Sequence, residues 1–191
     1  MRDVKIFLIC LPGVLFIDSA IAGNVLIVDA GNDQAPPEIV QFGQFEGSWS
    51  CKGFNPQEDG SWKANPWVSK WVWYYVLDGY AVQDVWIPGE GAPPGAAMGT
   101  NLRIYNPEQN QWHMVWTTHG QNEFDYFSAE FVDGAIVMHG EMPQRGQRNP
   151  HLAQITFYNI GEERFDWKYD FSPLADGQNW TEAARLACER S

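Results

Sequence analysis

The feature that most constrains the fold is a succession of about ten short strand-like segments separated by turn residues. Asp78-Gly79 and Asp133-Gly134 are two-residue sequences typical of tight hairpins. No convincing long helix lies between the segments, which favours an antiparallel meander over alternating strands and helices. The expected strands are residues 48–54, 67–77, 80–87, 100–105, 111–118, 123–132, 135–141, 151–159, 164–171 and 179–188.

Closure of this meander avoids unpaired edges, because an edge strand exposes a row of backbone donors and acceptors. The first strand would then pair with the last. Residues 37–42 precede the first strand with Ile39, Val40 and Phe42 apolar, and they predict a short helix. The predicted fold is therefore all-β, an antiparallel up-and-down β-barrel of about ten strands with a short N-terminal helix. An open two-sheet sandwich is the alternative.

Two stretches outside the regular strands are expected to be irregular. Residues 61–66 end in Pro66, and proline cannot donate to a strand ladder. Residues 88–99 contain three prolines and four glycines, and loops of this length are commonly functional or disordered. If the barrel holds a ligand, we expect the second stretch to lie at its mouth.

The amino terminus has the pattern of a secretion signal. Arg2 and Lys5 provide a basic start, residues 6–17 are apolar, and Ala20-Ile21-Ala22 has the small residues that signal peptidases recognise. The apolar run is shorter than the roughly 20 residues that span a bilayer. We expect a signal peptide over residues 1–22, a flexible lead-in over 23–36 and one barrel domain over 37–191. The mature protein would begin at Gly23 and be periplasmic or secreted; a buried cytosolic strand is the alternative.

Two cysteines remain once the signal, with Cys10, is removed. Cys51 lies in the first expected strand and Cys188 in the last. An even pair in an oxidising compartment predicts a disulfide, which would link the strands that close the barrel. Two unpaired buried thiols are the alternative.

The composition is strongly aromatic and acidic. Ten tryptophans, eleven phenylalanines and seven tyrosines suit strands and the walls of a cavity, although they could equally fill the barrel. A net charge of −12 disfavours nucleic acid and anionic membranes as partners. No stable membrane insertion is expected after signal removal.

Strand alternation sorts side chains into inward and outward sets. The rows Trp112, Met114, Trp116, Thr118 and Phe165, Trp167, Tyr169, Phe171 are predicted to point inward, with His113 and Asp170 among those facing water. Such aromatic rows predict a site for a flat or apolar small molecule. The predicted ligand-binding residues are Trp71, Trp73, Trp86, Arg103, Trp112, Trp116, Tyr126, Trp167 and Tyr169.

The candidate acid/base residues are Asp84, His139 and Glu141. His139 and Glu141 share one face of a strand, about 7 Å apart by strand rise, and a histidine so placed could act as a base with the carboxylate as its orienter. A solvated strand face is the alternative. Glu130, on the face of Tyr126, is a further polar residue that could point inward. The histidines and mature cysteines lack metal-ligand spacing, and no nucleophile elbow or phosphate loop occurs, so neither metal nor cofactor is expected.

Several short motifs occur in a fixed order along residues 37–190. They are Phe45, Gly47, Trp49 and Gly53; Leu77-Asp78-Gly79; Ile104-Tyr105-Asn106; Gly140-Glu141-Met142; and Asp176-Gly177 with Trp180 and Arg190. This order resembles a lipocalin-like (calycin-type) β-barrel family of secreted bacterial proteins, most of which lack an assigned function. Cys51 and Tyr80 stand where the family usually has glycine and arginine.

The opening motif is also similar to that of nitrobindin-type haem barrels. Those proteins bind iron through a late histidine, and no histidine follows His151 here, so haem is a less favoured possibility.

Two functions compete on this basis. In the first, the barrel binds a small apolar or aromatic ligand; in the second, its cavity catalyses an isomerisation, cyclisation or hydrolysis. A filled barrel with a structural role is a third possibility. Inward-facing His139 and Glu141 would favour the enzyme, whereas an aromatic cavity with one or two polar anchors would favour the binding protein.

Overall fold

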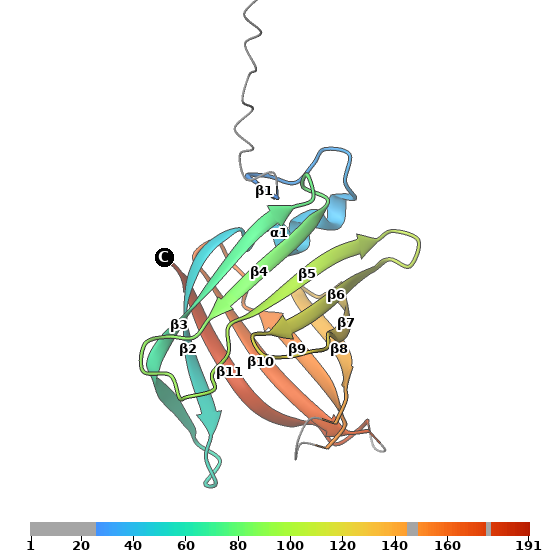
Figure 1. Cartoon of the computed structure of the whole chain (residues 1–191). Coiled ribbons are helices and arrows are strands. Elements are labelled where there is room, and N and C mark those ends of the chain that lie inside the picture. Colours follow the sequence, from blue (N-terminus) through green and yellow to red (C-terminus); the bar gives the residue numbers. More distant parts are fainter. Residues whose placement is uncertain (1–25, 145–148, 175–176) are drawn as a thin grey trace, which may run out of the picture.

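Ten antiparallel strands, β2 to β11, close into a barrel in the computed structural model, which describes residues 26–144, 149–174 and 177–191 (Figure 1). The expected signal peptide and Gly23 lie outside these residues. The elements are β1 (Ile27–Val28), η1 (Pro37–Ile39), α1 (Val40–Gly43), β2 (Gly47–Pro56), β3 (Trp62–Val76), β4 (Ala81–Ile87), β5 (Gly99–Asn106), β6 (Gln111–Thr118), β7 (Asp125–Val132), β8 (Ala135–Met142), β9 (His151–Tyr158), β10 (Arg164–Pro173) and β11 (Thr181–Arg190).

Every barrel strand pairs with two neighbours. Consecutive strands from β2 to β11 form hairpins, and β11 returns to pair with β2. The barrel formed by the described strands therefore has no edge strand that exposes a row of backbone donors and acceptors. The predicted up-and-down barrel with a short N-terminal helix is confirmed, and the sandwich alternative is not what the chain forms.

The disulfide between Cys51 and Cys188 is present at the closing seam. The two residues are directly opposite each other in the β2–β11 register, with their Cα atoms 4.1 Å apart. This separation lies within the reach of a disulfide, about 7 Å. The bond therefore fastens the first barrel strand to the last.

Strand β3 is longer than the sequence predicts. It begins at Trp62, so the stretch ending in Pro66, predicted to be irregular, belongs to the strand. Pairing with β2 shifts between Lys52↔Val68 and Phe54↔Ala64, and Pro66 lies within this irregularity. Proline is tolerated there because no aligned partner on β2 requires its missing N–H group.

The two hairpin signals have different outcomes. Asp133 and Gly134 both have positive φ angles, 51° and 79°, as a tight two-residue turn requires. The turn at Asp78-Gly79 is wider than predicted and spans residues 77–80. Gly79 is needed there because a Cβ would lie 2.4 Å from the backbone nitrogen of Asn32.

The described part of the lead-in and the helical turns lie over one end of the barrel (Figure 1). Ile27 and Val28, within the expected lead-in, pair with the end of β3. Pro37 starts the helical segment, where its missing N–H is no loss. Phe42 on α1 and Phe45 after it are fully buried, so this segment closes its end of the barrel.

Arg190, the last residue of the ordered motifs, meets the first motif at this same end. The Arg190 guanidinium lies 4.3 Å from the centre of the Trp49 ring, and its Nη1 donates to the carbonyl of Glu46 at 2.7 Å. The Trp49 Nε1 donates to the carbonyl of Phe45. These motif residues therefore join the helical segment to β2 and β11, which is a structural role.

The aromatic side chains divide into two groups along the barrel. Near α1 they pack densely: the ring of Phe45 lies 4.7 Å from that of Phe165 and 5.0 Å from that of Trp73, and Phe42 meets Trp112 at 4.9 Å. The indoles of Trp71, Trp86, Trp116 and Trp167 surround an open space in the other half. The barrel is thus filled at one end and hollow at the other.

Candidate functional site

The hollow half of the barrel contains a cavity of about 720 Å³. It lies toward the end away from α1, where the β4–β5 and β6–β7 connections contribute Gly95 and Gln121. This volume is within the range usual for small-molecule sites, roughly 300–1,000 Å³. Because Gly95 lines the cavity, part of the predicted 88–99 loop lies beside it.

Indole rings form much of the cavity wall. Trp71 meets Trp86 edge to face with ring centres 5.4 Å apart, and its ring lies 6.4 Å from that of Trp167. Trp167 in turn stacks with Tyr169 at 6.4 Å. Aliphatic side chains complete the wall: Met138, Met142, Ile155 and Leu186. Such a wall suits a flat apolar molecule, because aromatic faces and edges attract other aromatic rings.

Trp116 is opposite Asn101 in the β5–β6 ladder, and its ring reaches along β5 to Gly99, two residues away. A Cβ built on Gly99 would lie 2.2 Å from the Trp116 ring. The indole therefore lies against the bare backbone at the start of β5. The absence of a side chain at Gly99 is what permits this orientation.

A row of directly opposed residues crosses five neighbouring strands and carries several inward side chains. Trp73, Asp84, Asn101, Trp116 and Asp125 are successive cross-strand partners from β3 to β7. Because directly opposite residues in a ladder point to the same face, the polar members of this row all face the interior. The row thus places two carboxylates and an amide among the aromatic side chains.

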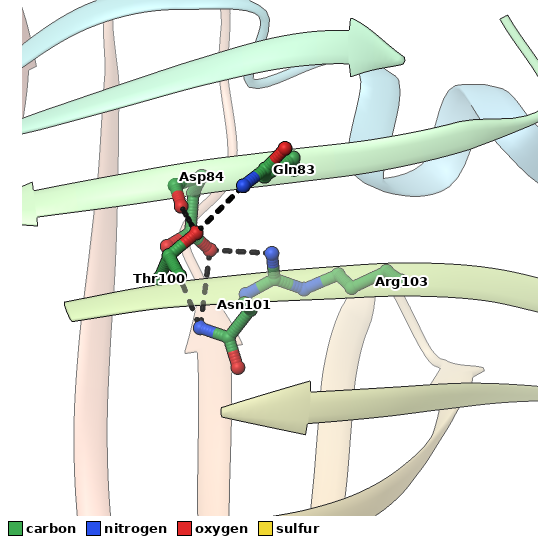
Figure 2. A network of polar contacts seen from close by, with 5 residues as sticks. All are labelled: Gln83, Asp84, Thr100, Asn101 and Arg103. Carbon is green, nitrogen blue, oxygen red and sulfur yellow. Dashed lines mark hydrogen bonds and ion pairs between the residues drawn. The ribbon is translucent and has the colours of Figure 1, made fainter. Parts of the chain in front are cut away.

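Asn101 and Arg103 form the polar floor of the cavity, and both contact the Asp84 carboxylate (Figure 2). The Asp84 carboxylate pairs with Arg103 Nη1 and accepts from Asn101 Nδ2, with N–O distances of 3.2 and 3.4 Å. Both charged side chains are fully buried. Such burial requires pairing, since an isolated charge inside a protein is strongly unfavourable.

Arg103 is held in place on its flat faces as well. Its guanidinium carbon lies 4.4 Å from the ring centre of Trp73 and 4.7 Å from that of Phe42. Burial lowers the pKa of Arg103, and the neighbouring Asp84 carboxylate opposes that change. Within the described residues, Arg103 Nε and Nη2 and Trp71 Nε1 are buried without a hydrogen-bond partner.

A second polar group lies near the open end. His151 is buried, its Nδ1 lies 3.0 Å from the Asn149 carbonyl oxygen, and its Nε2 lies 2.8 Å from the Tyr169 hydroxyl. With the Nδ1 proton donated to that carbonyl, Nε2 accepts from the hydroxyl. A further hollow of about 590 Å³ lies beyond Tyr169, which borders both spaces.

Most of the predicted ligand-binding residues line the cavity. These are Trp71, Trp86, Arg103, Trp116, Trp167 and Tyr169. Trp73 and Trp112 point inward but belong to the packed half, where both are almost fully buried.

Tyr126 lies on the outer face instead, with 67% of its surface exposed, and Phe124 and Glu130 are exposed with it. The inward residues of β7 are Asp125, Phe127 and Ala129, because the small Ala129 accommodates Trp112 opposite it. The prediction for Tyr126 and Glu130 is therefore wrong. Asp170, predicted to face water, is buried and pairs with Lys168 Nζ at 2.9 Å.

The three candidate acid/base residues are not brought together. His139 and Glu141 share a face of β8 as predicted, but this is the outer, exposed face of the barrel. Asp84 is inside and paired with Arg103. Sequence reasoning missed Asn101, Asp125 and His151, although alternation from Arg103 would have placed Asn101 inward.

No metal site and no membrane-spanning helix emerge from the residues that the structure describes. Within them, no three histidine, cysteine, aspartate or glutamate side chains are grouped closely enough to hold a metal ion. The helices in these same ranges are all too short to cross a membrane.

Comparison with known proteins gives a likeness of fold. No protein-family model and no curated protein sequence matches the chain. Among solved structures, Rv2717c from M. tuberculosis is similar with a TM-score of 0.55 and 10% identity, over 82% of this chain and 99% of that one. The S-type phycobiliprotein lyase CPES from Guillardia theta is similar with a TM-score of 0.51 and 11% identity, over 80% and 91%. At such low identity these likenesses show a shared lipocalin-like barrel fold.

Proposed function

We propose that this chain is an exported barrel protein that binds a small, flat, largely apolar molecule in its open half. The observation that carries the proposal is the cavity of about 720 Å³ walled by four indole rings, with its polar groups gathered at the floor and rim. An apolar pocket with a few convergent polar groups is the usual form of a small-molecule site.

The packed half of the barrel supports this role. Phe42, Phe45 and Trp73 fix the floor, and the Cys51–Cys188 bond fastens the closing strands beside it. A preformed wall lowers the cost of ordering side chains when a ligand binds. The ligand would therefore meet rings that are already held in place.

Export is part of the proposal and rests on two features. One is the signal-like pattern of residues 1–22, and the other is the disulfide, since such bonds persist in oxidising compartments. Amino-terminal sequencing of the protein from its own host is expected to begin at Gly23. A cytosolic product that retains Met1 would refute the export claim.

The second candidate is a small-molecule enzyme, an isomerase, cyclase or hydrolase. His139 and Glu141 face outward, so they do not support catalysis in the cavity. The enzyme hypothesis rests instead on the His151–Tyr169 pair, in which the hydroxyl of Tyr169, a residue bordering the cavity, lies 2.8 Å from the His151 imidazole. One neighbour in fold is described as a phycobiliprotein lyase, which is consistent with ligand chemistry in such a barrel. The binding role is favoured because most of the cavity wall is apolar.

The binding proposal is tested in two steps. Native mass spectrometry of the protein from its own host should find a co-purifying small molecule. Titration with the neutral probe N-phenyl-1-naphthylamine should raise probe emission and quench tryptophan emission. If no molecule co-purifies and the probe leaves tryptophan emission unchanged, the proposal fails.

A matched pair of variants localises the probe. Trp167→Ala removes a ring from the cavity wall, whereas Trp180→Ala removes a partly exposed ring that does not line it. We expect the first to weaken probe binding by about tenfold, since stacking on aromatic rings contributes about 1 kcal/mol or more. The second should leave binding within about twofold. Equal effects would place the probe elsewhere.

A further inference from the structure

We infer that the bound molecule carries a neutral carbonyl-type acceptor, such as a ketone, quinone or amide, that meets Arg103 at the cavity floor. This inference rests on the proposed binding function and names the chemical class of its ligand.

The first observation is the incomplete hydrogen bonding of Arg103. Its Nη1 is paired with Asp84, and its flat faces are covered by Trp73 and Phe42. Among the described residues, nothing accepts from Nε or Nη2, although the side chain is fully buried and lines the cavity. A buried donor without a partner is costly, so this edge of the guanidinium calls for an acceptor.

The second observation is that another donor beside the cavity is in the same condition. Trp71 Nε1 is buried, has no partner within the described ranges, and its ring lines the same space. Asn101 Nδ2 donates to Asp84, and within the described residues its Oδ1 accepts nothing from Arg103. Arg103 and Trp71 thus present hydrogen-bond donors without acceptors beside the cavity. Such donors favour a ligand that carries acceptor atoms.

Charge decides between a neutral acceptor and a carboxylate. The single positive charge of Arg103 is already balanced by the fully buried Asp84. A ligand carboxylate would leave one net negative charge in the cavity, which Asp125 also lines, in a chain of net charge −12. Burying an unbalanced charge costs far more than burying a carbonyl that accepts hydrogen bonds. The balanced pair thus offers strong donors without requiring an anion.

Three probes with one ring system test the inference: 2-ethylnaphthalene, 2-acetylnaphthalene and 2-naphthoate. We expect acetylnaphthalene to bind the wild-type protein about tenfold or more tightly than ethylnaphthalene, because it adds a hydrogen bond to a charged donor. Naphthoate should bind no more tightly than acetylnaphthalene. The carbonyl stretch of bound acetylnaphthalene should shift to lower wavenumber in the infrared spectrum.

Each other outcome has a separate meaning. Equal binding of the ethyl and acetyl compounds would overturn the inference while leaving the binding function intact. Tightest binding of naphthoate would overturn the choice of a neutral acceptor. If none of the three binds, the proposed function itself fails.

Removal of the balancing charge gives an independent test. In Asp84→Asn the charge of Arg103 is no longer compensated, so we expect the order to reverse and naphthoate to bind more tightly than acetylnaphthalene. Glu130→Gln, which removes a charge from the exposed outer face, should keep the wild-type order. An unchanged order in a folded Asp84→Asn protein would overturn the inference; if that variant does not fold, the wild-type series decides.

Discussion

Gly99 and Trp116 show how one missing side chain shapes the cavity. Because a Cβ on Gly99 would lie 2.2 Å from the indole, Gly99→Ala must displace the ring or the start of β5. We expect a loss of about 1–3 kcal/mol in the free energy of unfolding, as for other overpacked sites, together with weaker probe binding. Urea unfolding and probe titration measure the two effects.

Gly161→Ala is the matched control, since a Cβ there meets nothing closer than a backbone oxygen at 3.7 Å. It should change both quantities little. Wild-type stability and affinity in Gly99→Ala would contradict the proposed contact between Gly99 and Trp116.

At the scale of single residues, alternation predicted most inward side chains but could not choose between two plausible faces. On β6 it separates Trp112 and Trp116 from His113 correctly. On β7 both faces carry aromatic residues, so alternation alone does not favour the inward Phe127 over the outward Tyr126. The deciding fact is the match of Ala129 to Trp112, which depends on register across strands and not on either strand alone.

The helical segment stabilises the barrel through Phe42. This side chain is fully buried against Trp73, Trp112 and Phe157. Phe42→Ala is expected to lower the free energy of unfolding by about 3–5 kcal/mol, because it leaves a cavity beneath Arg103. Val40→Ala, on the exposed side of the same helix, should cost less than about 0.5 kcal/mol in the same urea experiment. Similar costs for both would show that α1 does not close the barrel end.

The closing disulfide should contribute measurably to stability. It joins residues 137 apart in sequence, and such a long loop loses much entropy in the unfolded chain when it is closed. We expect Cys51→Ala/Cys188→Ala to unfold with about 2–5 kcal/mol less free energy than the oxidised wild type. Wild-type protein under reducing conditions serves as the control and should behave like the variant. Equal stability of oxidised and reduced protein would contradict this account.

Elements could be predicted where turn chemistry marks their ends. Asp133-Gly134 fixed one hairpin because both residues adopt positive φ. The start of β3 could not be found, since Pro66 signals a break and only the shifted β2–β3 register makes it acceptable. Likewise β1 exists because residues at the end of β3 pair with it, which no local pattern in the lead-in reveals.

For the whole molecule, the aromatic composition left open whether the barrel is filled or hollow, and it proves to be both. Phe42 and Phe45 supply the rings that fill one half. In the other half, where Trp86 and Trp167 line the cavity, no helical segment among the described residues supplies such rings. Composition counts rings but does not place them along the barrel axis. The central claim follows from that division: a preformed aromatic cavity at one end binds a small molecule.

Methyl NMR of methionine-labelled protein tests this claim most directly. Met138 and Met142 line the cavity, Met114 is buried but does not line it, and Met98 is exposed and does not line it. Saturation with N-phenyl-1-naphthylamine is expected to shift the methyl signals of Met138 and Met142 strongly, through the ring currents of the bound probe, and to shift Met114 and Met98 little. Unchanged Met138 and Met142 signals at probe saturation would contradict the account.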